Sequence, residues 1–477
     1  TTGWECSSLD ASIPRGTKDG MSMADPAGTS DTPEGRGGWL NALGLHRKEL
    51  RAWAMYDWAI SAFATTVMGA LLPFFYSGVA ASTLDEGLGG SIYAFTTSIA
   101  LLIIAVISPV LGAIADFKGS KKRFMAFFAG LGILFTSFLW FVGEGDWIFA
   151  SVVFIIANVG FAAANVFYES LLPSIASDEE VDRVSTAGYA IGYVGGGLLL
   201  ALNFLWVAFP DTFGLSGQAQ ATRLSFVSAA VWWALFSIPI FKRVKEPPRR
   251  LEVGEDPGVS PLRVGFSRVG ETLRELRRFR QVFIFLLAFW FYNDGIGSII
   301  KLAGTFGFDI GLSQTEVLAT FLAVQFLAIP FTFGFGWLAG KMGAKRSLQL
   351  ALMVYLLICI FAFFMTTATH FFLMGLAVAM VQGGAQALSR SIFATIVPRS
   401  KSSQFFGFFS VSAKFAGIFG PLVFGGVGLL MGSSRPAIGS LVIFFVVGMY
   451  FLSKLDIEEG RRVAAEEDAE MRVVAAG

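Results

Sequence analysis

The chain has 477 residues, of which 54% are hydrophobic and only 15% are charged, and its formal net charge is +1. Soluble domains usually carry about 25% charged residues, and nucleic-acid-binding domains carry a clear basic excess, so both classes are disfavoured. Two cysteines and two histidines are too few for the usual zinc or redox sites, and we expect no metal and no cofactor. The composition indicates a polytopic membrane protein surrounded by lipids.

The N-terminal residues 1–50 are polar and rich in Gly, Ser, Thr, Asp and Pro. They contain no apolar stretch of the length found in a cleavable signal peptide. We therefore expect residues 1–50 to form a disordered cytoplasmic tail.

Twelve long apolar runs follow in chain order. A helix that crosses the hydrocarbon core needs about 20 mostly apolar residues. The runs are continuously apolar instead of alternating in polarity, which indicates membrane helices and not the strands of a barrel. They lie near 54–78, 92–114, 124–142, 147–172, 184–208, 224–241, 282–305, 316–339, 347–366, 371–397, 404–430 and 437–453.

Basic residues gather in the loops on one side of these spans. The segment 242–281 alone holds eleven, whereas the opposite loops hold only Arg223 and Arg435. Since positive loops stay in the cytoplasm, both termini are predicted to be cytoplasmic. We expect a six-helix half at 51–241, a basic central loop at 242–281, a second half at 282–453 and a cytoplasmic tail at 454–477. Within the loop, 263–279 is either an amphipathic helix on the membrane surface or a solvated linker helix.

The two halves share a motif at an offset of 224 residues. The first copy reads Gly112-Ala-Ile-Ala-Asp116-Phe-Lys-Gly119-Ser-Lys121-Lys122, and the second spans 336–346 with Gly340 where the acid would stand. Its glycines allow helix ends to approach closely, and Asp116 is suited to accept from a helix N-terminus or to pair with a base. We expect it to be a gating loop held at the cytoplasmic surface by its lysines.

This motif resembles the loop between the second and third spans of the major facilitator superfamily. Segments inside the spans resemble more specifically the vacuole-effluxer-like family, also called the "unknown major facilitator" family, in its bacterial branch. The resemblance implies an all-α protein with twelve transmembrane helices in two pseudo-equivalent halves, located in a bacterial inner membrane. Fungal members are linked to amino-acid efflux from vacuoles, which implies an amino acid or a similar metabolite as cargo. The segments are 56–66, 165–173, 292–295, 386–391 and 414–421.

Several ionisable and polar side chains lie inside the predicted spans. A charge at the bilayer centre costs at least about 2.5–3.5 kcal/mol, so these residues should face protein or water. We predict that they line a substrate or ion pathway, and interhelical hydrogen bonding is the alternative for the uncharged ones. The candidates are Asp57, Ser61, Asn165, Glu169, Asp294, Lys301, Gln386, Arg390 and Lys414.

Three roles follow from the expected depth of these residues. Arg390 is predicted to form a cytoplasmic gate with Asp57 or Glu169, because an unpaired Arg at that depth is costly. Asp294, near the midplane, is predicted to couple transport to a proton or to recognise a cation; a static pair with a nearby lysine is the alternative. A zwitterion such as an amino acid could bridge Asp294 and Lys414.

The chain shows no nucleophile–base motif, no metal-ligand spacing and no ATPase motif, so we do not expect an enzyme. The leading hypothesis is a monomeric secondary active transporter of a small solute, with a proton as the candidate coupling ion and no nucleic-acid partner. The alternative is a membrane sensor or lipid-handling protein on the same fold.

Overall fold

The computed structural model describes residues 40, 44–85, 87–118, 120–246, 279–398, 405, 408, 409, 412, 413 and 415–476. Over these ranges the chain forms helices joined by short turns, without a strand. The all-α membrane architecture predicted from the sequence is therefore confirmed.

The first half begins with one long helical segment and continues with five further membrane helices. In the first segment, two stretches are wound as π-helix, a form that often occurs at functional sites. The elements are α2 (Lys48–Ser61), η1 (Ala62–Leu71), α3 (Leu72–Phe75), η2 (Tyr76–Ala80), α4 (Leu88–Lys118), α5 (Lys121–Phe138), η3 (Leu139–Phe141), α6 (Trp147–Ile175), α7 (Asp178–Ala208), η4 (Pro210–Phe213) and α8 (Gln218–Arg243).

The second half repeats this plan and ends with a helix outside the bundle. Its elements are α10 (Arg280–Asp309), α11 (Gln314–Met342), α12 (Ala344–Phe363), α13 (Ala368–Ile396), α15 (Phe419–Met431), α16 (Ser434–Ser440), α17 (Val442–Lys454) and α18 (Ile457–Ala476). The segment 454–477, predicted to be a cytoplasmic tail, contains the continuous helix α18.

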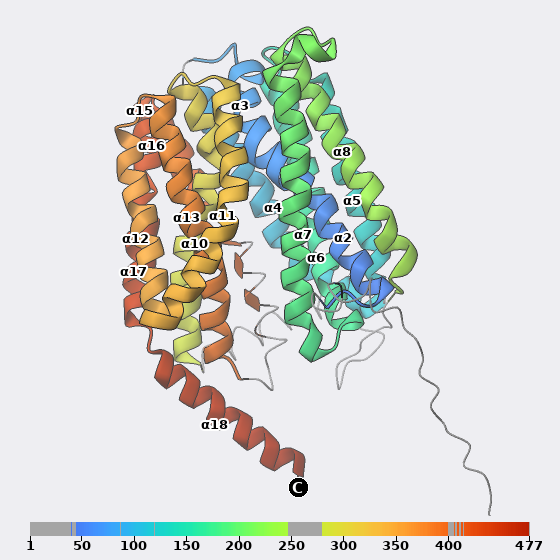
Figure 1. Ribbon diagram of the computed structural model, residues 1–477, viewed down its shortest axis with the longest axis vertical. Helices are drawn as coiled ribbons and strands as arrows, with labels where there is room; N and C mark the ends of the chain where they lie inside the picture. Colours follow the sequence, from blue (N-terminus) through green and yellow to red (C-terminus); the bar gives the residue numbers. More distant parts are fainter. Residues whose placement is uncertain are drawn as a thin grey trace, which may run out of the picture.

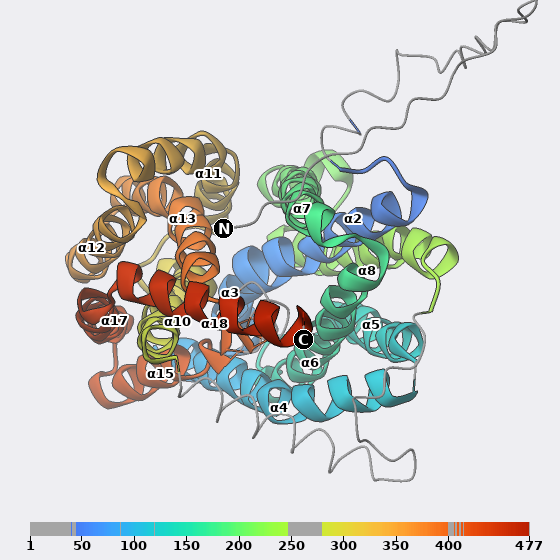
Figure 2. The ribbon, with the colours of Figure 1, turned by 90° about the horizontal axis from the view of Figure 1, so that it is seen from below.

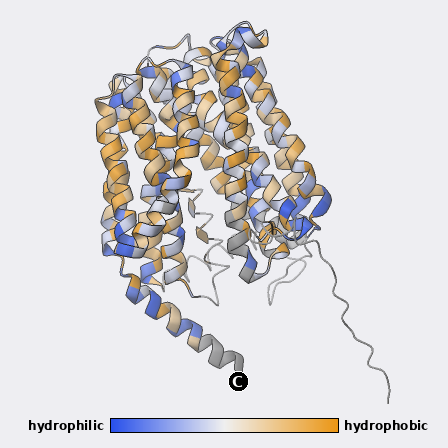
Figure 3. Ribbon diagram, in the orientation of Figure 1, coloured by the Kyte–Doolittle hydropathy of each residue, from blue (hydrophilic) through white to orange (hydrophobic). Residues whose placement is uncertain are grey.

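The described residues contain 11 helices long and apolar enough to cross a membrane. These correspond to every predicted span except the eleventh, 404–430, of which the structure describes the 13-residue helix α15. Apolar residues cover the middle of the bundle, and polar residues gather at its two ends and along α18 (Figure 3).

The helices form two groups, α2–α8 and α10–α17, that stand side by side (Figure 1). The groups meet where α4 packs on α15 and α7 packs on α11, as is visible from below (Figure 2). We call the lower end of the bundle in Figure 1, where α8 ends and α18 begins, the basic side, because it carries Lys121, Lys122 and Lys345.

The predicted gating loop is mostly helical. α4 continues to Lys118, so Gly112 and Asp116 belong to a helix instead of a loop, and Gly119 lies outside the described residues. The predicted apolar run 92–114 ends within this motif, at the polar residues that start with Asp116, whereas the helix continues through them to Lys118. The predicted amphipathic helix at 263–279 also lies outside the described residues.

Candidate functional site

One face of the first span carries Asp57, Ser61 and Thr65, and this face packs against a row of glycines on α7. A Cβ at Gly188 would overlap the Asp57 carboxylate, and one at Gly192 would lie 2.7 Å from Ser61 Oγ. A Cβ at Gly196 would lie 2.8 Å from Thr65 Oγ1. Both rows recur every four residues, which places each on one helix face. The glycines thus bring α7 directly onto the helix face that carries Asp57 and Ser61, two of the predicted pathway residues.

Asp57 is held by an aromatic cluster that involves α2 and α6. Tyr168 Oη donates to Asp57 Oδ2 at 2.7 Å, and its ring stacks on Trp53 with centroids 4.5 Å apart. Trp53 Nε1 donates to the Tyr168 carbonyl at 3.1 Å. Because Tyr168 is 3% exposed, the carboxylate has a fixed, buried donor on one oxygen.

Arg390 connects the two halves through a tyrosine that was not predicted as a site residue. Its Nη2 donates to Tyr189 Oη at 2.6 Å, and the guanidinium lies 4.4 Å from the centroid of the same ring. Tyr189 also lies within electrostatic range of Asp57 and Glu169. Glu169 and Arg390 are exposed, and Tyr189 is 43% exposed. We call Asp57, Tyr168, Glu169, Tyr189 and Arg390 the inner polar cluster.

The predicted gate between Arg390 and a carboxylate stays a prediction. In this structure Arg390 rests on Tyr189, while Asp57 accepts from Tyr168. Asp57 nevertheless lies within electrostatic range of both Arg390 and Glu169. The cluster therefore brings all three gate candidates into one region at the boundary between the halves.

Asp294 belongs to α10, and its side chain contacts the start of α15. Its Oδ2 accepts from the Phe419 amide at 3.0 Å, and its Oδ1 accepts from the Gly420 amide at 2.9 Å. Ser298, one turn along α10, donates to Oδ1 at 3.4 Å. Asp294 is 2% exposed, so the carboxylate is buried and caps a helix N-terminus.

The remaining pathway candidates are spread along the same helices. Lys301 is half-buried on α10, within electrostatic range of Asp294. Asn165 is half-buried on α6, with no hydrogen-bond partner for its Oδ1 among the described residues, and Gln386 is exposed on α13. Lys414 lies outside the described residues, so its expected bridge to Asp294 stays a prediction.

One lysine of each copy of the repeated motif caps the last membrane helix of its half. Lys122 Nζ donates to the Phe241 carbonyl at 3.0 Å, at the end of α8. In the second half, Lys345 Nζ donates to the Ser453 and Leu455 carbonyls at 3.1 and 2.6 Å, at the end of α17. A cation at a helix C-terminus compensates the exposed carbonyls. Lys121 instead donates to the Ser170 carbonyl of α6 at 3.2 Å.

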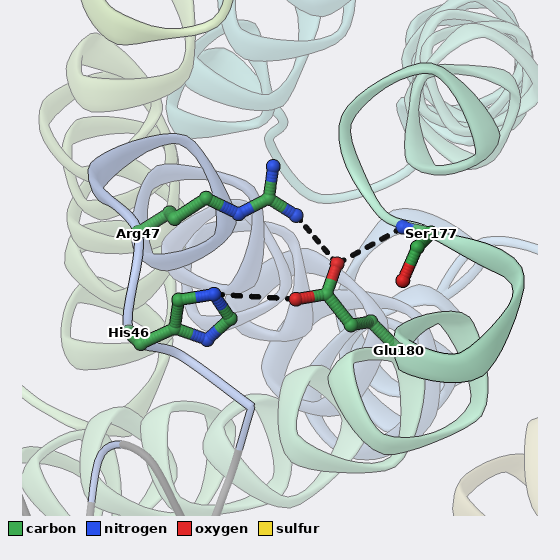
Figure 4. Close-up of polar contacts among 4 residues, drawn as sticks. All are labelled: His46, Arg47, Ser177 and Glu180. Atoms are coloured by element: carbon green, nitrogen blue, oxygen red, sulfur yellow. Dashed lines mark hydrogen bonds and ion pairs between the residues drawn. The ribbon is translucent and has the colours of Figure 1, made fainter. Parts of the chain in front are cut away.

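A charged cluster joins the starts of α2 and α7 on the basic side (Figure 4). Arg47 Nη2 lies 2.5 Å from Glu180 Oε2, and His46 Nε2 lies 3.2 Å from Glu180 Oε1. The Ser177 amide donates to Glu180 at 2.9 Å as part of a capping box. This backbone hydrogen bond, together with Arg47, lowers the pKa of Glu180.

On the side opposite to the basic side, hydrogen bonds and ring contacts join the two halves. They link α3 with α10, and α8 with α11. The pairs are Thr305 Oγ1 to the Pro73 carbonyl at 3.3 Å, Gln314 Nε2 to Thr222 Oγ1 at 2.8 Å, Gln218 Nε2 to Thr315 Oγ1 at 3.3 Å, and the Phe74 and Phe308 rings with centroids 5.2 Å apart.

Among the described residues there is no group of three or more His, Cys, Asp or Glu side chains that could hold a metal ion.

Similarity to known proteins agrees with this arrangement. Residues 89–465 match the family model described as "Vacuole effluxer Atg22 like". The chain is 35% identical over 424 residues to the uncharacterized MFS-type transporter YxiO of Bacillus subtilis, covering 88% of this chain and 98% of the relative. It is 25% identical over 433 residues to autophagy-related protein 22 of Saccharomyces cerevisiae, covering 79% of each chain.

Solved transporters share the fold at low sequence identity. A D-xylose-proton symporter has a TM-score of 0.63 at 14% identity, with 86% of this chain and 98% of that chain covered. A bacterial homolog of the human lysosomal transporter Spinster, in an inward-facing and unoccupied conformation, has a TM-score of 0.60 at 16% identity, with 90% and 99% covered. The chain is a membrane transporter of the major facilitator type and belongs to the vacuole effluxer Atg22-like family.

Proposed function

We propose that this protein is a secondary active transporter that moves a small zwitterionic solute, such as an amino acid, by alternating access. The observation that carries the proposal is the inner polar cluster, where exposed groups of opposite charge, Glu169 and Arg390, come from opposite halves. A solute that contacts both would link its own binding to the relative position of the halves.

The contacts between the halves support an alternating mechanism. On the side opposite to the basic side, hydrogen bonds and ring contacts join α3 to α10 and α8 to α11. Among the described residues, the cluster on the basic side contributes a hydrogen bond between the halves, from Arg390 to Tyr189. We infer that the basic side faces the cytoplasm and that this arrangement is closed toward the other side.

The cluster also suits the recognition of a zwitterion. Arg390 uses one guanidinium nitrogen on Tyr189, which leaves further N–H donors for a carboxylate. Glu169 supplies an acceptor for an ammonium group, and the exposed rings of Tyr189 and Tyr193 can pack against an apolar side chain. Asp294 is a less accessible ammonium partner, because it is 2% exposed and is held by backbone amides.

We propose a proton as the coupling ion and Asp57 as the group that takes part in coupling. Asp57 has one described hydrogen-bond donor, Tyr168, and lies in range of Arg390. Asp57 can bind a proton, or it can stay ionised and pair with Arg390. When the two conformations of the transporter favour different states of Asp57, proton binding is linked to the conformational change.

The test is uptake and counterflow by the purified full chain in proteoliposomes, with a panel of labelled amino acids and an imposed pH gradient. We expect saturable flux for at least one amino acid, lost in Glu169→Gln and Arg390→Gln. Arg461→Gln, which changes an exposed ion pair on α18, is the matched control and should keep the wild-type rate. Flux with a neutral solute but with no amino acid would overturn the substrate class, and absence of all flux would favour the sensor alternative.

A further inference from the structure

The eleventh span is interrupted in the middle of the bundle. Residues 416–418 are not helical, and α15 begins at Phe419. Pro421 accounts for the interruption, because it lacks an N–H and its ring conflicts with the carbonyl four residues earlier, at Gly417. The amides of Phe419 and Gly420 are therefore at a helix start, where the preceding helix cannot satisfy them.

The C-terminal half binds the amides at this interruption. Asp294 of α10 accepts from both of them, at 3.0 and 2.9 Å. Gly420 allows this approach, because a Cβ there would overlap Ser298 Oγ and lie 2.7 Å from Asp294 Oδ1. Hydrogen bonds from amides to a buried carboxylate are about twice as strong as neutral ones, so α15 is firmly attached to α10.

The N-terminal half binds the carbonyl at the same point. Ser98 of α4 donates to the Ile418 carbonyl at 3.1 Å, and Ser98 is 2% exposed. Farther along α15, a Cβ at Gly425 would lie 3.0 Å from the Ser91 carbonyl. α4 thus touches the interruption and the helix that follows it, from the opposite half.

We propose that residues 416–418 form a hinge of the transport cycle, with Asp294 and Ser98 as its two positioning residues. The proposal rests on the proposed alternating-access function. When the halves rock, a segment bound by both must release one of them. Asp294 makes two charge-assisted hydrogen bonds and Ser98 makes one neutral hydrogen bond, so the Ser98 contact is the one that breaks. Ser98 therefore stabilises the conformation described here relative to the other one.

The first test follows amide hydrogen exchange at residues 419–422 in the full chain in nanodiscs, without substrate. We expect Asp294→Ala to accelerate exchange at Phe419 and Gly420 by about tenfold, and Asp294→Asn, which keeps one acceptor oxygen, to have a smaller effect. Ser298→Ala is the matched control, because it removes the neighbouring hydroxyl and leaves both backbone hydrogen bonds. Unchanged exchange in Asp294→Asn, whether or not Asp294→Ala folds, would overturn the role of Asp294.

The second test measures the distance between the halves with spin labels at Lys242→Cys on α8 and Arg346→Cys on α12, in a Cys6→Ser background. Both labelled positions are exposed on the basic side. Each of the two conformations should give its own distance between the labels. We expect Ser98→Ala to change the ratio of the two populations by about threefold to tenfold, and Ser98→Thr, which keeps the hydroxyl, to restore the wild-type ratio. An unchanged distribution in Ser98→Ala would overturn the hinge. Neither measurement depends on transport. Both therefore test the hinge even when the proposed substrate class or coupling ion is wrong.

Discussion

Tyr168 donates a 2.7 Å hydrogen bond to Asp57, and this contact fixes the one carboxylate of α2 that lies within the membrane span. A carboxylate on the first helix of the second half, Asp294, is fixed by backbone amides instead. Each carboxylate has a serine one turn later, Ser61 and Ser298, and each faces a glycine of the neighbouring helix. Both halves thus combine a carboxylate, a serine four residues later and a facing glycine, but the hydrogen-bond donors to the carboxylate differ.

Tyr168→Phe removes the donor to Asp57 while keeping the stacked ring. A hydrogen bond to a charged acceptor contributes about 1.5–3 kcal/mol, so we expect a lower melting temperature and slower transport. Thermal unfolding in detergent and initial counterflow rates measure the two effects. A variant with wild-type values in both assays would mean that the contact does not hold Asp57 in the working protein.

Gly188→Ala places a methyl group onto the Asp57 carboxylate and 2.8 Å from Trp53. Overpacking of this kind costs about 1–3 kcal/mol, and the helix face that carries Asp57 would move away from α7. The matched control is Gly130→Ala on α5, where a Cβ meets no atom within 4 Å and helix propensity predicts a gain of about 0.5–1 kcal/mol. Melting temperatures should therefore change in opposite directions, and equal changes would contradict the packing argument.

The charged cluster on the basic side predicts a pH dependence. The Ser177 amide and Arg47 lower the pKa of Glu180. A carboxyl group with a depressed folded-state pKa stabilises the fold above its unfolded pKa, and this stabilisation is lost as the pH falls through the folded pKa. We expect wild type to melt at a higher temperature than Glu180→Gln at neutral pH, and the difference to vanish under acidic conditions.

The comparison of Glu180→Gln with wild type needs a variant that keeps the charge. Glu180→Asp retains the carboxylate but shortens its reach to Arg47, and it should fall between the two. A difference between wild type and Glu180→Gln that is constant from neutral to acidic pH would show that the cluster stabilises by packing and not by its charge.

Lys345 should determine whether α18 stays attached to the bundle. It caps α17 immediately before α18 begins, and Gln281 of α10 holds the Asp456 amide at 2.9 Å. We expect Lys345→Gln to increase protease cleavage and hydrogen exchange within 457–469, and Lys345→Arg to retain protection. Lys122→Gln, which uncaps α8 in the other half, is the control and should leave 457–469 unchanged.

The apolar pattern is enough to predict most of this fold. Twenty apolar residues in a row can only cross the membrane as a helix, so the spans and their repeat follow from the sequence. The interruption before Phe419 was missed, because Ala, Gly and Ile at 416–418 continue the apolar run even though Pro421 signals a break. The four-residue spacing of Asp57, Ser61 and Thr65 places them on one helix face, and the same spacing of Gly188, Gly192 and Gly196 on α7 identifies the face that packs against it.

The contact between Arg390 and Tyr189 could not be predicted from the sequence. Leaving an arginine near the end of a span without a partner costs free energy, so the sequence predicts that it pairs with a nearby carboxylate. Which group it meets depends on how α13 of one half approaches α7 of the other, and this geometry is set by packing between the halves. The exposed position of Tyr189 gives no periodic signal in the sequence.

The pair of Arg390 and Tyr189 gives the sharpest test of the inner polar cluster. Tyr189→Phe keeps the ring under the guanidinium and removes the hydroxyl acceptor, whereas Tyr189→Ala removes both. Cation–π contacts contribute about 0.5–2 kcal/mol, so we expect Tyr189→Ala to slow counterflow by roughly twofold to thirtyfold and Tyr189→Phe to slow it less. Tyr450→Ala is the matched control, because Tyr450 also lies near a cation, Lys454, but at an exposed site on α17. Equal rates for Tyr189→Ala and Tyr450→Ala would mean that Tyr189 does not orient Arg390 during transport.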